Sequence, residues 1–161
     1  MRSKMSEEQA PKRKKVSNTE KRRNARSFVL QALYSQELTK NPTNEVEAHF
    51  RVDNDMSETD VPLFSELLQG VNAQKAELDQ AFNIYLDRNV EELDPVEVSV
   101  LRIGAYELIN RIEVPYKVAI NESVELAKIF GATESHKYVN GVLDKLAQKV
   151  RAVEIKANRG K

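Results

Sequence analysis

The sequence of 161 residues contains no cysteine and no tryptophan. The absence of cysteine excludes disulfides, thiolate metal sites, cysteine nucleophiles and iron–sulfur clusters. No apolar run approaches the roughly 18 residues that a transmembrane helix needs, and the first residues are charged where a signal peptide would be apolar. We therefore expect one cytoplasmic domain that does not enter a membrane, since a chain of this length forms about one domain.

The charges balance over the whole chain, with 25 basic and 25 acidic residues, but they are unevenly placed along it. Residues 1–26 hold ten basic and three acidic side chains, and residues 135–161 hold seven and two. Residues 27–94 hold four basic and fourteen acidic side chains. Two basic ends and an acidic middle are typical of a protein that binds a polyanion at one place and a basic partner at another. Charges that are merely solvated are the alternative.

Helical periodicity recurs along the chain, and no alternating strand pattern interrupts it. A capping box of Ser17 and Glu20 predicts a helix to about Leu38, and Asp94 before Pro95 predicts a central, mostly buried helix to about Arg111. Weaker or shorter helices are expected around Val46–Phe50, over 61–71, 74–87 and 118–130, and from about Ser135 to Lys156 with Val150 and Val153 inward. The fold class is therefore all-α, a compact single-domain bundle of about seven helices. We expect a disordered basic arm over 1–16, the helical domain over 17–156 and a frayed tail over 157–161.

Signals for catalysis are absent from the sequence. His49 and His136 do not lie in a ligand-spaced motif, and the glycines do not form a phosphate-binding loop. Adjacent acids such as Glu91 and Glu92 do not face each other on a helix. We expect no catalytic residue, no metal and no cofactor.

Basic side chains crowd the start of the first helix, at Arg22, Arg23 and Arg26. Cations at a helix N-terminus are unfavourable because the helix dipole favours acids there. A phosphate backbone would compensate, since arginine meets phosphate with a planar fork of donors. A solvated basic end is an equally good interpretation of these residues alone.

Aromatic and basic residues also lie together near the predicted start of the last helix, where Phe130 is followed by Lys137 and Tyr138. Tyr85 with Arg88 is a smaller pair of the same kind. Proteins that bind single-stranded RNA typically place cations against its phosphate backbone and aromatic rings against its unstacked bases. Taken singly, such rings are more often core residues.

Short motifs follow one another in a fixed order between residues 20 and 151. They are RRNAR (22–26), LQALY (30–34), LRI (101–103), YEL (106–108), VPYKVAINE (114–122), ELAK (125–128), FG (130–131) and SHKYVNGVLD (135–144). In this order they resemble the NusB family of bacterial transcription antitermination factors.

The resemblance implies a NusB-like bundle of two helical sub-bundles that binds the boxA RNA of ribosomal RNA operon transcripts. It also implies a heterodimer with the small-subunit ribosomal protein NusE, which joins NusA, NusG and RNA polymerase in an antitermination complex. By position, the implied RNA contacts are Arg22, Arg23, Arg26, Tyr85, Phe130, Lys137 and Tyr138, to which we add Arg88. The implied contacts to the ribosomal protein are Tyr34, Glu91 and Glu97.

Two departures from the family pattern are Asn24, which interrupts a more continuous basic run, and Thr133-Glu134, which replaces an acidic pair. The same fold also precedes the catalytic domain of ribosomal RNA cytosine methyltransferases. Because the chain ends at Lys161, we expect the stand-alone factor. A stand-alone RNA-binding domain related to those enzymes and a helical scaffold that binds no RNA are the alternatives.

Overall fold

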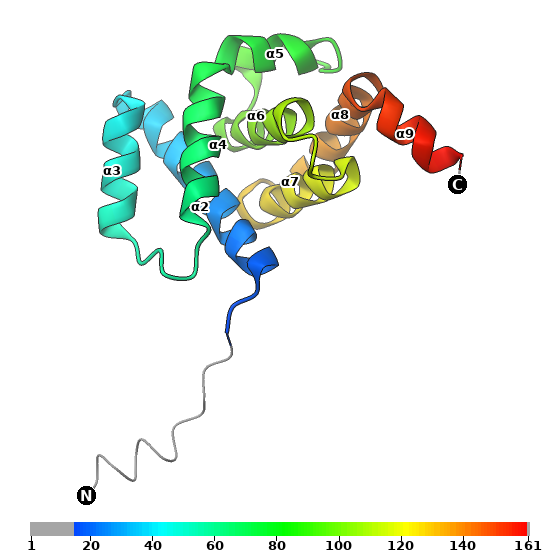
Figure 1. Cartoon of the computed structure of the whole chain (residues 1–161). Coiled ribbons are helices and arrows are strands. Elements are labelled where there is room, and N and C mark those ends of the chain that lie inside the picture. Colours follow the sequence, from blue (N-terminus) through cyan, green and yellow to red (C-terminus); the bar gives the residue numbers. More distant parts are fainter. Residues whose placement is uncertain (1–14, 161) are drawn as a thin grey trace, which may run out of the picture.

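The computed structural model describes residues 15–160. The basic arm expected over 1–16 therefore lies almost entirely outside the described residues. Within them the chain is all-α, as predicted, and Figure 1 shows the helices gathered into a compact bundle. Its helices are α2 (Asn18–Thr39), α3 (Thr43–Asp53), α4 (Val61–Ala73), α5 (Lys75–Asn83), α6 (Pro95–Asn110), α7 (Tyr116–Phe130), α8 (Ser135–Val150) and α9 (Ala152–Arg159), with one 3₁₀ turn, η1 (Val90–Glu92).

The helices form two groups that meet at α6. Helices α2, α3 and α4 pack against one another, and α6, α7 and α8 do the same, while α6 also contacts α2, α4 and α5. Residues 98–108 of α6 are buried without interruption, which confirms that this helix is the central element. The described part of the chain thus has eight α-helices where about seven were predicted, because the C-terminal segment divides into α8 and α9.

Side-chain caps form the two helix starts predicted at Ser17 and Asp94. Ser17 Oγ accepts a hydrogen bond from the backbone N–H of Glu20 at 3.1 Å. Asp94 Oδ1 accepts from the backbone N–H groups of Val96 and Glu97 at 2.8 and 3.4 Å. Each cap satisfies backbone donors that a helix N-terminus leaves without a partner, so these starts are fixed by local sequence.

The C-terminal helix differs from its prediction. It ends at Val150, and α9 continues in a new direction to Arg159, so that Val153 is 86% exposed instead of inward. The break is at Arg151, whose buried guanidinium donates to the carbonyl oxygens of Leu108, Glu107 and Arg111 at 2.7, 3.2 and 2.9 Å. These carbonyls lie at the end of α6, where those of Glu107 and Arg111 also accept the backbone N–H groups of Arg111 and Val114 at 3.1 and 3.0 Å, so the guanidinium adds to the capping of this helix end. Arg151 therefore joins the end of α8 to the end of α6.

Candidate nucleic-acid interface

A groove of about 980 Å³ lies between the first turns of α2 and the length of α7. Its lining mixes cations, carboxylates and apolar side chains, which suits a ligand with both charged and apolar parts. The lining residues are Thr19, Arg22, Arg23, Arg26, Arg111, Glu113, Val114, Pro115, Val118, Asn121, Glu122, Val124, Glu125, Lys128 and Ile129.

Arg22 and Arg23 lie at the α2 side of this groove. The Arg23 side chain is 59% exposed, and its Nε donates to both carboxylate oxygens of Glu122 on α7, at 3.0 and 3.3 Å. The hydrogen bond to Glu122 is the main cause that raises the pKa of Arg23 above its usual value. Arg22 Nη2 donates to the hydroxyl of Thr19 at 3.4 Å. Both guanidinium groups are accessible to a ligand in the groove.

Arg26 lies at the base of the groove and is not accessible. Its Nε and Nη2 donate to the two carboxylate oxygens of Glu107 on α6 at 2.9 and 2.8 Å, and the two side chains are 4% and 0% exposed. A buried carboxylate needs a paired cation, because an isolated buried charge is costly. The predicted RNA contact at Arg26 is corrected accordingly: in this structure its guanidinium is occupied by Glu107.

The α7 side of the groove carries Lys128 beside an apolar wall. Lys128 is half exposed and forms an ion pair with Glu125 at 3.3 Å. Val118 is 42% and Ile129 is 69% exposed. Single-stranded RNA has phosphates that attract cations and base faces that pack on rings and other apolar groups, and an exposed apolar wall beside a cation is chemically suited to such a ligand.

A second cluster joins the loop after α5 to the start of α8. Tyr138 Oη donates to Asp87 Oδ1 at 3.0 Å, and the Arg88 guanidinium lies over the Tyr138 ring, 5.0 Å from its centroid. Arg88 also donates to Asp87 at 2.7 Å. These bonds, from Arg88 first and Tyr138 second, lower the pKa of Asp87, while burial raises the pKa of Tyr138. The sequence suggested Arg88 and Tyr138 but missed Asp87, which holds both.

The remaining predicted RNA contacts are spread around this cluster. Phe130, at the end of α7, is 36% exposed and follows directly on Ile129 of the groove. Lys137 is 71% exposed and pairs with Glu134 at 3.1 Å. Tyr85 is half-buried and packs against the core, so only part of its ring is accessible.

The three residues predicted to contact a protein partner lie on different elements. Tyr34 on α2 is 40% exposed, and Glu91 is exposed in η1. Glu97 is half-buried in the first turn of α6 and accepts a hydrogen bond from Ser135 Oγ at 2.9 Å. Because α2 packs against α6, Tyr34 and Glu97 belong to neighbouring helices.

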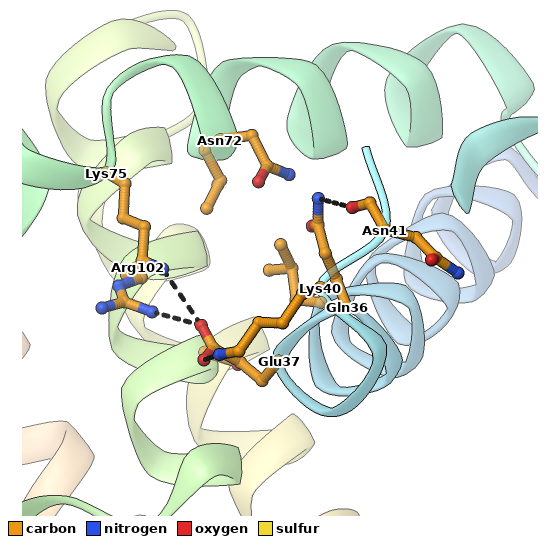
Figure 2. A pocket seen from close by; sticks show the side chains of 10 residues that line it. Gln36, Glu37, Lys40, Asn41, Asn72, Lys75 and Arg102 are labelled. Atoms are coloured by element: carbon orange, nitrogen blue, oxygen red, sulfur yellow. Dashed lines mark hydrogen bonds and ion pairs between the residues drawn. The ribbon is translucent and has the colours of Figure 1, made fainter. Parts of the chain in front are cut away.

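A smaller cavity of about 200 Å³ lies between α2, α4 and α6, and Figure 2 shows three cations around Glu37 in it. Lys75 and Arg102 contact one Glu37 oxygen at 3.1 and 3.4 Å, and Lys40 contacts the other at 3.5 Å. Burial opposes ionisation of Glu37, but the hydrogen bond from Lys75 and the charges of Arg102 and Lys40 lower its pKa. The carboxylate of Glu37 in this cavity is thus paired with three cations.

Two kinds of site are absent from residues 15–160. No group of His, Asp or Glu side chains there has the arrangement of a metal site. None of the helices in the same range is long and apolar enough to span a bilayer.

Comparisons with known proteins give one consistent result. The sequence model of the NusB family matches residues 23–148. The chain is 57% identical over 145 residues to the transcription antitermination protein NusB of Pseudomonas entomophila (strain L48), covering 90% of this chain and 87% of that protein. It is 56% identical over 154 residues to NusB of Marinomonas sp. (strain MWYL1), covering 93% and 88%.

Solved structures agree in fold. A crystal form of T. maritima NusB matches with a TM-score of 0.71 and 28% identity, covering 79% of this chain and 90% of that one. A crystal structure of the antitermination factors NusB and NusE in complex with dsRNA matches with a TM-score of 0.69 and 23% identity, covering 78% and 95%.

Proposed function

The chain belongs to the NusB family of transcription antitermination proteins, a non-enzymatic family, and from this premise we propose its ligands. It binds the boxA RNA of ribosomal RNA operon transcripts together with the ribosomal protein NusE, and the pair promotes processive transcription of those operons. It does so in the cytoplasm, in a complex with NusA, NusG and RNA polymerase.

The observation that carries the RNA proposal is the groove between α2 and α7. Arg22 and Arg23 lie on one side of it and Lys128 on the other, with apolar side chains of α7 between. Cations at both sides receive phosphates, and the apolar wall receives the bases of an unpaired strand. From the groove the same helix leads through Phe130 toward α8 and the Tyr138–Arg88 cluster, which extends the proposed RNA path.

The protein-partner proposal rests on charge and on the relatives. The acidic segment 27–94 contains both Tyr34 and Glu91, and a basic ribosomal protein is complementary to its charge. One chain in the solved complex of NusB, NusE and dsRNA has the same fold as this chain. We propose Tyr34, Glu91 and Glu97 as the contacts to NusE.

The test is a titration of the purified chain with fluorescent RNA at two salt concentrations, with and without purified NusE. The probes are a single-stranded boxA-like oligonucleotide, a scrambled one of the same composition, and a duplex of the boxA-like sequence. We expect the boxA-like single strand to bind most tightly, NusE to tighten it further, and affinity to fall as salt rises. Equal affinity for the boxA-like and scrambled strands, with and without NusE, would contradict the proposal. Tighter binding of the duplex would replace single-strand recognition with recognition of helix shape.

A further inference from the structure

The groove between α2 and α7 contains one arginine whose orientation is set by another side chain. Arg23 is 59% exposed, yet its Nε is bonded to both oxygens of Glu122, which is itself only 10% exposed. A guanidinium has five N–H donors, one on Nε and four on the two Nη atoms. The pair therefore uses the Nε donor and leaves the four Nη donors for another acceptor.

A second ion pair one turn along α7 provides a contrast. Lys128 and Glu125 are separated by 3.3 Å, and both are about half exposed, so each can move freely. Exposed pairs of this kind fix little geometry, because two long side chains must be ordered in high dielectric. The Glu122 side chain, by contrast, is nearly buried in the wall of the groove, and both of its carboxylate oxygens accept the N–H of Arg23 Nε.

We propose that Glu122 is a positioning residue that holds Arg23 so that its Nη edge faces an RNA phosphate. This inference rests on the RNA-binding function proposed above. Arginine meets phosphate through two parallel N–H···O bonds, so the orientation of the guanidinium plane decides whether both form. Glu122 fixes that orientation before RNA arrives, which removes part of the entropy cost of ordering a long side chain on binding.

Charge alone predicts the opposite effect of Glu122. A carboxylate in the groove repels phosphate, so its removal should tighten RNA binding. Glu125→Gln removes a carboxylate from the same helix and leaves the hydrogen bonds between Arg23 and Glu122 intact, but it also frees Lys128, so the comparison is repeated in an Arg23→Ala background. The part of the difference between Glu122→Gln and Glu125→Gln that depends on the presence of Arg23 then reports the orientation of Arg23.

The experiment measures the affinity of both variants and of wild type for the boxA-like RNA in the presence of NusE, at low and at high salt. We expect Glu122→Gln to bind roughly threefold to tenfold more weakly than Glu125→Gln, as the ordering of one arginine side chain implies. The difference should persist at high salt, where screening removes the charge effect. It should shrink by the same threefold to tenfold when both substitutions are compared in an Arg23→Ala background, where only the release of Lys128 remains.

Three results would overturn the inference. If Glu122→Gln binds as tightly as Glu125→Gln, Glu122 acts only as a competing charge. If the difference is undiminished in the Arg23→Ala background, Glu122 does not act through Arg23. Arg23→Lys keeps the positive charge at an exposed position but lacks the parallel N–H donors of a guanidinium. It therefore tests whether an oriented guanidinium is needed, with little risk to folding. It should weaken binding by a similar factor, and full affinity would contradict the need for an oriented fork. Absence of RNA binding by wild type would instead refute the proposed function itself.

Discussion

Replacement of Arg26 tests whether this residue supports the fold or contacts RNA. Arg26→Ala leaves the carboxylate of Glu107, which is 0% exposed, without the two donors at 2.8 and 2.9 Å. Breaking a buried ion pair on one side costs about 3–5 kcal/mol. At about 2–4 °C per kcal/mol for a chain of this size, we expect the Tm to fall by at least about 6 °C. The RNA affinity of the protein that remains folded should change by less than about twofold, since no phosphate contact is lost.

Thermal unfolding by circular dichroism and RNA titration at a temperature where both proteins are folded give the two readouts. The double replacement Arg26→Met with Glu107→Leu is the matched control, because exchanging both members of a buried pair for apolar residues is often neutral or stabilising. It should recover most of the lost stability. If Arg26→Ala kept its Tm and lost RNA affinity as strongly as Arg22→Ala, the assignment of Arg26 to the core would be refuted.

Three further outcomes follow from the same geometry. Arg22→Ala and Arg23→Ala should each flatten the dependence of log K on log salt by about 0.7 if each residue meets one phosphate of a single strand, and unchanged slopes would place the RNA elsewhere. Arg151→Ala removes three donors from carbonyls at the end of α6, of which those of Glu107 and Arg111 keep a backbone partner, and should lower the free energy of unfolding by about 1–3 kcal/mol in urea titrations, which an unchanged value would contradict. Glu97→Lys should weaken NusE binding and its salt dependence. Glu45→Lys, at an exposed position on α3, is its control, and equal effects would remove Glu97 from the partner surface.

Local signals allowed the helix starts to be predicted from the sequence. Ser17 and Asp94 cap their helices through their own next few residues, so no distant part of the chain is needed to interpret them. The burial of α6 could also be predicted from the sequence, because its many apolar residues leave little polar surface on any side of the helix.

The role of Arg26 could not be predicted in the same way, because it depends on a residue 81 positions away. Arg22, Arg23 and Arg26 are one residue type in one segment, and only the packing of α2 on α6 separates the buried arginine from the exposed ones. A signal was present nonetheless. Glu107 lies among mostly apolar residues of α6, and a buried carboxylate in such a place requires a buried cation. The burial of Arg151 had no such signal, because its neighbours Val150 and Val153 are exposed.

The placement of charge along the sequence corresponds only in part to its placement in space. The two basic ends suggested a common surface for a polyanion, but every lining residue of the groove lies in 19–26 or 111–129. The C-terminal segment 135–161 contributes none of them, and its best-placed cation, Lys137, is paired with Glu134 beside the second cluster. The cation opposite Arg22 and Arg23 is Lys128, from a stretch of the chain whose net charge is slightly negative. The proposed attraction of a polyanion therefore depends on the local arrangement of α2 and α7, because fields at contact distance depend on neighbours in space and are screened beyond about 10 Å.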